Sequence, residues 1–507
     1  MSEECKRLDL LRLFAAASPV ILIAILVIFW NMSAFGLSVW GILFTAVIAW
    51  TVFQTSIMTI LLGAVDGLIT TFPLLLTVFF GIILSVLLIE TGALSRIVNG
   101  LSKGFRDPMH LVNGICFGIE NFVAGAGIVT EPIIAPALKA IGLPAKSAAI
   151  LASWGYAGIM SFTLAGVFVV ILSILTGLDA QRLAVITAII SIVPMLVFGI
   201  AIPLVLEKSA LAKGRLFFNA STAFVCGILI LFFVVYVSSS TACMLAGIAL
   251  LGGIVLLSRS TPDFSAIRFV DVAPFLILIV GLSIVNIYQP LRNLANERLV
   301  FAISVVPVHT AKIKPFMDAY TYLIIAIMVT IWGLKIERHQ LYLIIKSTMP
   351  RAVRAIMAMM LFGAMGQIIA LTGYEAHTGS IVTANNIPYV LASGLSTMSG
   401  KFYPFFAPLL GWVGKFLTGY GSLSIMIFGK LQVEIAQFIN VSPEILSSAM
   451  MVGSGIGSIS SPFKVAMATS LVDAVGKEGE ILRKTIPLGI AIALITGIWC
   501  YVLTHIL

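Results

Sequence analysis

The stretch TGYGSLSIMIFGKLQVEIAQFINVSPEILSSAMMVGSGIGSISSPFKVAMATSLVD, residues 418–473, decides the fold. In an otherwise apolar chain it gathers glycines, hydroxyl side chains and ionisable groups. Residues 453–462 alone contain three glycines, four serines and a proline. Each glycine costs about 1 kcal/mol and each proline about 3 kcal/mol in a helix interior. We therefore expect a helix to break here.

A broken helix has a specific meaning inside a membrane. Lipid offers no hydrogen bonds to the freed backbone groups, so a break is tolerated only where it is buried in protein or lines a cavity. The alternative is a small-residue face that packs helices together. As half of a binding site, the break contributes these candidate ligand contacts: Gly455, Ser458, Ser460, Ser461 and Lys464.

Composition sets the class of protein. Of the 507 residues, 60% are hydrophobic and only 10% are charged, whereas a soluble domain carries about 25% charged residues. The apolar runs suffice for about 11–13 crossings of about 20 residues each. The sequence therefore predicts an all-α polytopic membrane protein, with two hairpins and broken helices in inverted repeats. We place it in the cytoplasmic (inner) membrane of a prokaryote.

Basic loops suggest the topology. The segment 335–354 has the densest basic cluster, so we place it in the cytoplasm, and counting crossings outward puts three further basic loops on the same side. Residues 57–72 are apolar but short and hold Asp66, so they are either a crossing or an interfacial helix. Residues 286–315 resemble an extramembrane loop that partly lies on the surface. The net charge of +9 is then a topology signal, and no nucleic-acid partner is expected.

An internal repeat organises the chain. Phe-Gly and Thr-Gly pairs end two spans, at 80–92 and 362–373, and each span is followed by a glycine-rich turn, a proline turn and a small-residue stretch. Such repeats are typical of secondary transporters, with the site at the repeat interface near the midplane. The predicted organisation is N-terminal helices (1–72), first repeat (73–206), connecting helices and loops (207–349), and second repeat with the C-terminal span (350–507).

Two acids of the first repeat are candidates for proton coupling. Ionisable side chains within membrane segments are costly and point to function by default. Glu120 lies inside an apolar run, where burial favours the protonated form of a carboxyl group. Glu131 is the second candidate. Its alternative role is that of an N-terminal charge that favours the short helix beginning at Pro132.

Small polar and glycine residues complete the predicted substrate site. The lysine at 464 would supply positive potential for an anion beside the amides of a helix start, or would instead snorkel to an interface. Lys430 and Glu434 are spaced to pair with one another on a helix. The other candidate contacts are Gly125, Gly127, Thr130, Ser153, Tyr156, Ser161, Tyr420, Ser422 and Ser424.

Several classes of function are not expected. The five histidines are dispersed without a paired metal spacing, so neither a metal site nor an integral-membrane enzyme is predicted. The five cysteines likewise lack a metal-ligand spacing. No nucleotide-binding motif appears, so we expect no cofactor and an ion gradient as the source of energy.

Particular segments carry a family resemblance. Residues 410–419, 428–432, 460–462 and 475–480 resemble the bacterial L-lactate permease family, and 117–118 and 142–149 are similar to its first half. The resemblance implies a proton symporter of lactate or a related small 2-hydroxymonocarboxylate, with H⁺ as coupling ion and Na⁺ as the alternative. The chain departs from the family pattern at 420–428, at Lys464 and near Ala124. A carrier of another organic anion, or an inorganic-ion exchanger, therefore stays open, as does a homo-oligomer.

Overall fold

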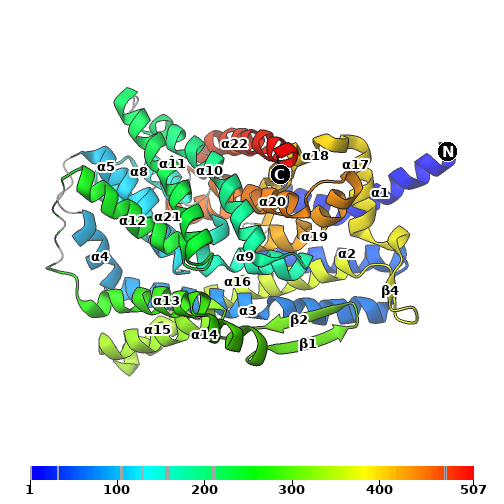
Figure 1. Cartoon of the computed structure of the whole chain (residues 1–507), viewed down its shortest axis with the longest axis horizontal. Helices are drawn as coiled ribbons and strands as arrows, with labels where there is room; N and C mark the ends of the chain where they lie inside the picture. The colour runs from blue at the N-terminus through cyan, green and yellow to red at the C-terminus, as the bar shows by residue number, and fades with distance from the viewer. Residues whose placement is uncertain are drawn as a thin grey trace.

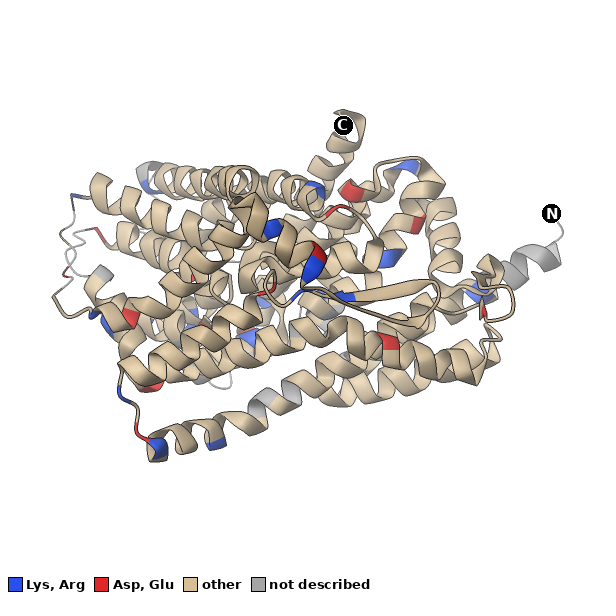
Figure 2. Ribbon diagram, turned by 60° about the horizontal axis from the view of Figure 1, so that its bottom comes forward, with Lys and Arg blue, Asp and Glu red and all other residues tan. Residues whose placement is uncertain are grey.

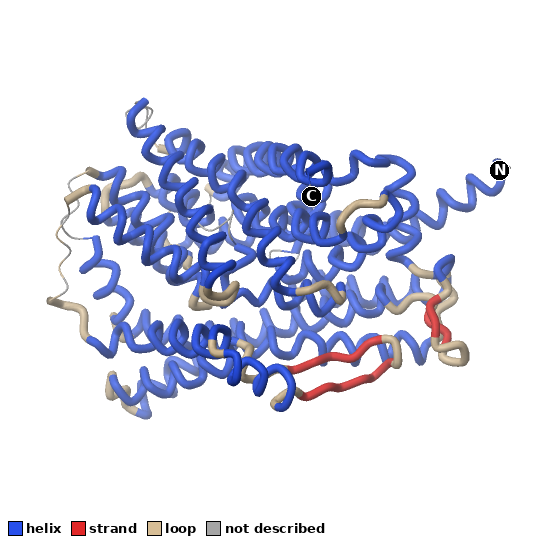
Figure 3. Tube along the Cα trace, in the orientation of Figure 1, coloured by secondary structure: helices blue, strands red, loops and turns tan. Residues whose placement is uncertain are grey.

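The computed structural model describes the chain except residues 1–2, 31–33, 103–106, 128–129, 155–159, 207–212, 260, 262, 264, 419–420, 473, 475–476 and 507. Most of the described residues are helical, and the described strands form two small two-stranded sheets (Figure 3). Helices α3 (Ile57–Glu90), α13 (Phe269–Ile287), α15 (Ala319–Gly333) and α16 (Arg338–Ala370) run in roughly the same direction along the long axis of the molecule, whereas α11 (Lys213–Tyr236) slopes steeply across that direction (Figure 1).

The first half of the chain contains a long helix, a hairpin and a broken helix. Its elements are α1 (Glu3–Trp30), α2 (Ala34–Thr51), α3 (Ile57–Glu90), α4 (Ala93–Ser102), α5 (Pro108–Asn113), the π-helix η1 (Gly114–Ile119), α6 (Glu120–Gly125), α7 (Glu131–Ala140), α8 (Ala145–Trp154), the 3₁₀ helix η2 (Met160–Phe162), α9 (Thr163–Thr176) and α10 (Ala180–Val205).

The connecting region begins with three apolar helices. Its elements are α11 (Lys213–Tyr236), α12 (Ala242–Leu257), α13 (Phe269–Ile287), α14 (Gln289–Asn293), the π-helix η4 (Leu294–Arg298), β1 (Phe301–Val306), β2 (His309–Ile313) and α15 (Ala319–Gly333).

The last part repeats the pattern of the first. Its elements are α16 (Arg338–Ala370), β3 (Tyr374–Glu375), β4 (Ser380–Ile381), the 3₁₀ helices η5 (Thr383–Asn385) and η6 (Gly400–Phe402), α17 (Ile387–Ser399), α18 (Tyr403–Thr418), α19 (Gly421–Ile439), α20 (Pro443–Ile456), the 3₁₀ helix η7 (Gly457–Ser460), α21 (Pro462–Ser470) and α22 (Glu478–Ile506).

The predicted membrane character is confirmed. Within the described residues, five helices are long and apolar enough to cross a membrane, namely most or all of α3, α10, α11, α13 and α22, and six shorter helices are also apolar. Charged side chains are sparse along the ribbons (Figure 2). The chain is therefore a helical polytopic membrane protein.

The two halves carry their elements in the same order. The long helices α3 and α16 are each followed closely by a glycine in the left-handed region, Gly92 with φ +68° and Gly373 with φ +74°. In the second half, α20 leads into the 3₁₀ turn η7 and then α21 before the long helix α22, and in the first half α8, η2 and α9 follow in this order before α10. The two halves thus share this order of elements, and their inverted orientation stays a prediction.

Residues 57–72 are not a separate segment. They form one helix with 73–90, because α3 runs through Pro73 without a break. Helix α3 packs tightly against α16: a Cβ on Gly67 would lie 2.5 Å from the carbonyl oxygen of Gly363. Neighbouring helices of this kind allow proline inside a membrane helix, so the separate crossing or interfacial helix expected here was wrong.

The region predicted as a loop at 286–315 contains regular structure. Strands β1 and β2 form an antiparallel hairpin rich in β-branched residues, which packs on α3 and is prominent in Figure 3. Val306 at its turn is buried in a small apolar cluster with Leu371 and Tyr374. The hairpin is therefore part of the packed structure.

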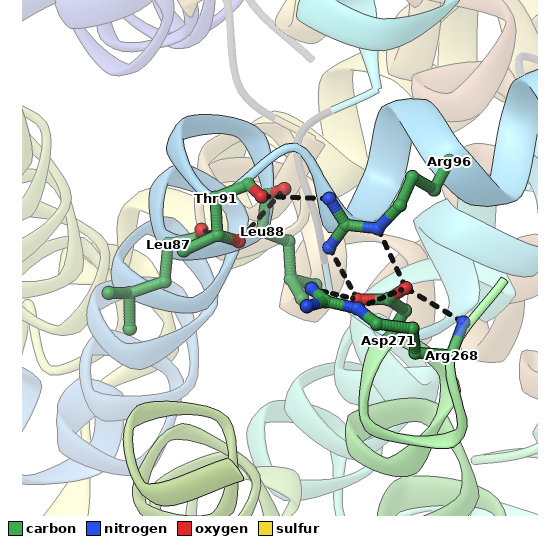
Figure 4. A network of polar contacts seen from close by, with 6 residues as sticks. All are labelled: Leu87, Leu88, Thr91, Arg96, Arg268 and Asp271. Carbon is green, nitrogen blue, oxygen red and sulfur yellow. Dashed lines mark hydrogen bonds and ion pairs between the residues drawn. The ribbon is translucent and has the colours of Figure 1, made fainter. Parts of the chain in front are cut away.

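Two arginines fix the start of α13. Asp271 is completely buried, and its carboxylate accepts from Arg96 Nη2 at 2.6 Å and Nε at 2.8 Å, and from Arg268 Nη2 at 3.1 Å. Arg96 also donates to the carbonyl of Thr91 at the end of α3 (Figure 4). The network thus joins α3, α4 and α13.

Replacing Asp271 with asparagine is expected to lower the free energy of unfolding by roughly 1.5–3 kcal/mol, the range for hydrogen bonds to charged groups. Thermal unfolding of the purified protein in detergent measures the change. Glu297→Gln, at an exposed position of η4, is the control and should unfold like the wild type. Equal stability of the Asp271 variant and the wild type would contradict the anchoring role.

Candidate functional site

The predicted break in the second half exists and begins at Gly457. Helix α20 ends at Ile456, η7 follows, and α21 starts at Pro462. Gly453 and Gly455 therefore lie within α20. A Cβ on Gly453 would come within 1.9 Å of the carbonyl oxygen of Pro408 in α18. Helix packing thus explains Gly453, while the break itself lies at 457–461.

The two acids of the first half lie on either side of a turn: Glu120 is inside the helical run that passes from α5 through η1 to α6, and Glu131 begins α7. Glu120 is the first residue of α6 and Glu131 the first of α7, and both are completely buried. Thr130 Oγ1 donates to Glu120 Oε1 at 3.3 Å. Gly127, with φ +86°, adopts the left-handed conformation that glycine favours in the turn between these helices.

An ion pair joins the two halves. Lys464 Nζ donates to Glu131 Oε1 at 2.5 Å, across 333 positions of sequence. The lysine is 6% exposed, so it does not reach the surface as a snorkelling lysine would. Removing two charges from water costs several kcal/mol per ion, which their attraction must offset. The pair therefore links the first hairpin firmly to the broken helix of the second half.

A second buried lysine was missed as a site residue. Lys415 in α18 is 1% exposed and packs on the break, since a Cβ on Gly457 would lie 2.6 Å from its own Cβ. Lys415 forms no direct ion pair with the described residues, although it interacts electrostatically with Glu131. The signal was available, because a lysine within an apolar run is as unusual as Lys464.

These four side chains form one electrostatic unit, which we call the four-charge cluster: Glu120, Glu131, Lys415 and Lys464. Glu120 interacts electrostatically with both Glu131 and Lys464. When all four groups are ionised, two negative and two positive charges sum to zero. In this fully ionised state the cluster carries no net charge.

Several elements that carry predicted site residues contact one another. Ser458 Oγ donates to Met160 Sδ at 2.9 Å, which joins η7 to η2. Ser454 Oγ donates to the carbonyl of Gly421 at 3.3 Å, which joins α20 to the start of α19. The Glu131–Lys464 pair joins α7 to α21. A shared cavity at mid-membrane depth stays a prediction.

Two predicted hydroxyl groups are buried without a partner. Within the described part of the chain, Ser161 Oγ and Ser461 Oγ form no hydrogen bond, and neither does the indole N–H of Trp154 at the end of α8. Buried polar groups in native proteins are nearly always bonded, so such exceptions suggest a missing water, ion or ligand. These groups remain available to a substrate.

Other predicted contacts are already engaged. Hydroxyl groups donate to carbonyls from Ser153 to Ile150, from Ser424 to Gly411 and from Ser460 to Thr485. The backbone N–H groups of Gly457 and Ser461 also donate within the chain. Not all amides of the break are therefore free to bind an anion.

Three predicted contacts are buried in packing. A Cβ on Gly125 would lie 2.7 Å from Met244 of α12, while Gly455 and Ser422 are buried within their helices. Tyr156 and Tyr420 fall outside the described residues.

Comparison with known proteins places the chain in a family. The profile described as L-lactate permease matches residues 250–507 of this chain. The chain belongs to the L-lactate permease family. Glycolate permease GlcA of Escherichia coli K12 is 36% identical over 134 residues, which are 26% of this chain and 22% of that protein.

Further family members align over similar lengths. The L-lactate permease of E. coli K12 is 38% identical over 110 residues, which are 21% of this chain and 20% of that permease. The L-lactate permease of Halalkalibacterium halodurans is 27% identical over 124 residues, 24% of each chain. The matched stretches thus span less than a quarter of each of these permeases. Among solved structures, the YdaH transporter of Alcanivorax borkumensis aligns over 87% of this chain and 86% of its own, with a TM-score of 0.42 and 14% identity.

Proposed function

We propose that this chain is a secondary active carrier that moves lactate or a related small 2-hydroxymonocarboxylate across the cytoplasmic membrane together with a proton. The observation that supports it best is the buried pair between Lys464 and Glu131. A lysine held by an internal carboxylate is a ready site for a second carboxylate. The aligned relatives are named for lactate and glycolate, which are both 2-hydroxymonocarboxylates.

Exchange of carboxylates at Lys464 explains proton coupling. In the empty site its ammonium group is bonded to Glu131. A substrate carboxylate that replaced Glu131 at Lys464 would leave that glutamate ionised and buried without its lysine, at a cost of several kcal/mol. A proton on Glu131 removes the charge and releases the lysine. The proton is then bound at Glu131 while the substrate anion is bound at Lys464.

Charge balance makes the coupling obligatory. The four-charge cluster has no net charge when it is empty. It becomes −1 with the anion alone and +1 with the proton alone, and either state places an uncompensated charge in a medium of low polarity. Only the empty state and the state with both ligands are neutral. These two states are therefore the ones expected to cross between the two sides.

Recognition of the 2-hydroxyl group falls to the unpartnered polar atoms. A buried donor or acceptor without a partner costs roughly 1–3 kcal/mol, and Ser161, Ser461 and Trp154 each have one such atom. A substrate hydroxyl can donate to one group and accept from another. A monocarboxylate without a hydroxyl would leave these atoms unsatisfied, so it should bind less tightly.

Uptake into proteoliposomes tests the proposal. Lactate, glycolate, acetate, phosphate and chloride are compared under imposed pH and Na⁺ gradients, each alone. We expect accumulation of lactate and glycolate with the pH gradient, and weaker uptake of acetate. Accumulation driven by the Na⁺ gradient alone would show that Na⁺, and not the proton, is the coupling ion. Uptake restricted to phosphate or chloride would instead favour an inorganic-ion exchanger.

Glu120 is proposed to pass the proton to Glu131. Its Oε1 accepts from Thr130, while its Oε2 is buried without a hydrogen bond in the described structure. We expect Glu120→Gln to bind lactate but to lose at least about a hundredfold in the initial rate of pH-driven uptake, the lower end of the effect of a positioned proton-transfer group. Glu375→Gln, in β3, is the control. Wild-type accumulation by Glu120→Gln would contradict this role.

A further inference from the structure

A second buried carboxylate lies outside the four-charge cluster. Asp66 in α3 is completely buried. Its Oδ2 is 2.7 Å from His309 Nδ1 of β2 and accepts from Gln367 Nε2 of α16 at 2.8 Å. Three elements distant in sequence therefore meet at one acid, which we call the Asp66 site.

Few other charges surround this acid. Lys430 of α19 interacts electrostatically with Asp66 and also with Glu434 of its own helix. Helices α2, α9 and α15, which also pack on α3, contain no charged residue. The second carboxylate oxygen, Asp66 Oδ1, forms no hydrogen bond within the described structure. The acid is therefore only partly satisfied by its neighbours.

His309 connects this acid to the surroundings of the protein. It lies on the hairpin, and 21% of its side chain is exposed. An imidazole has two nitrogens, and Nδ1 faces Asp66, so Nε2 can exchange a proton separately. A proton that binds Nε2 allows the Nδ1 proton to pass to Asp66 Oδ2. The imidazole is left neutral, with one proton gained by the carboxylate.

We propose that Asp66 and His309 form a second proton-binding site, separate from Glu120 and Glu131, in which the histidine carries protons between water and the buried carboxylate. Protonation of Asp66 removes the negative charge that His309 of the β1–β2 hairpin and Gln367 of α16 contact. Helix α16 packs against both α3 and α19. The loss of charge at Asp66 therefore acts on α16 and, through it, on α19. A purely structural pair would anchor the hairpin without exchanging protons.

Infrared difference spectroscopy after a rapid drop in pH tests the site on purified protein without substrate. In the wild type, the carbonyl band of a protonated carboxyl group should rise. Asp66→Asn should lose one component of that band. His309→Leu should keep the component but slow its rise about tenfold or more, because the route through the imidazole is gone. Lys312→Gln, exposed on the same strand, should behave like the wild type.

Two results would overturn the proposal: an unchanged spectrum in Asp66→Asn, or an unchanged rate in His309→Leu. If Asp66→Asn does not fold, the rate in His309→Leu decides alone. Glu120→Gln and Glu131→Gln should keep the Asp66 component, which shows that the two proton sites are distinct. Because no substrate is present, these measurements do not depend on lactate being the cargo.

Discussion

Replacing Lys464 with glutamine is expected to abolish proton-driven uptake of lactate, with a loss of at least about a hundredfold in initial rate. The variant leaves Glu131 buried beside an amide. Breaking a buried ion pair by removing one partner costs about 3–5 kcal/mol, more than the roughly 2.8 kcal/mol that corresponds to a hundredfold change. Because the ion pair is broken, the variant should also unfold at a lower temperature in detergent than the wild type.

The double variant Glu131→Gln with Lys464→Gln separates stability from coupling. It removes both charges, so most of the lost stability should return, whereas proton-driven accumulation should not. Uptake and thermal unfolding are measured on the same preparations. Wild-type uptake by Lys464→Gln, or by the double variant, would show that the pair is structural and that the substrate anion binds elsewhere.

Replacing Lys415 with glutamine is expected to weaken lactate binding at least about tenfold, which corresponds to about 1.4 kcal/mol. The lysine is buried on the break and forms no direct ion pair within the described structure. Its removal therefore breaks no salt bridge, yet it removes one of the two positive charges that a bound carboxylate would meet. Thermal stability should consequently change much less than in the Lys464 variant.

Calorimetric titration of purified protein with lactate measures this affinity. Lys401→Gln in η6, exposed near the start of α18, is the matched control and should bind like the wild type. Unchanged affinity in Lys415→Gln would remove this lysine from the site. A loss of stability as large as that of Lys464→Gln would instead indicate a structural role.

The sequence predicted features that depend on local physics. The break before Pro462 follows from helix propensities within ten residues, and the class of the protein follows from composition. The contact between Glu131 and Lys464 spans 333 positions. No local rule joins two residues so far apart, so each was a candidate alone and their pairing came only from the fold.

The misses have physical causes of their own. The continuity of α3 through Pro73 depends on its packing against α16, which the segment itself does not encode. Lys415 lies in a motif that suggested family membership, and its burial is a property of the packed bundle. The hairpin of β1 and β2 is held by contacts with α3 and with residues beyond α16. Each of these features is set by tertiary contacts.

The zero net charge of the four-charge cluster has an electrical consequence. A membrane potential does about 2.3 kcal/mol of work per 100 mV on each elementary charge that crosses. If the cluster crosses empty in one direction and with one proton and one monocarboxylate in the other, no net charge moves in either step. Lactate would then follow the pH difference and ignore the voltage. A second proton carried at Asp66 in the same cycle would make transport draw current.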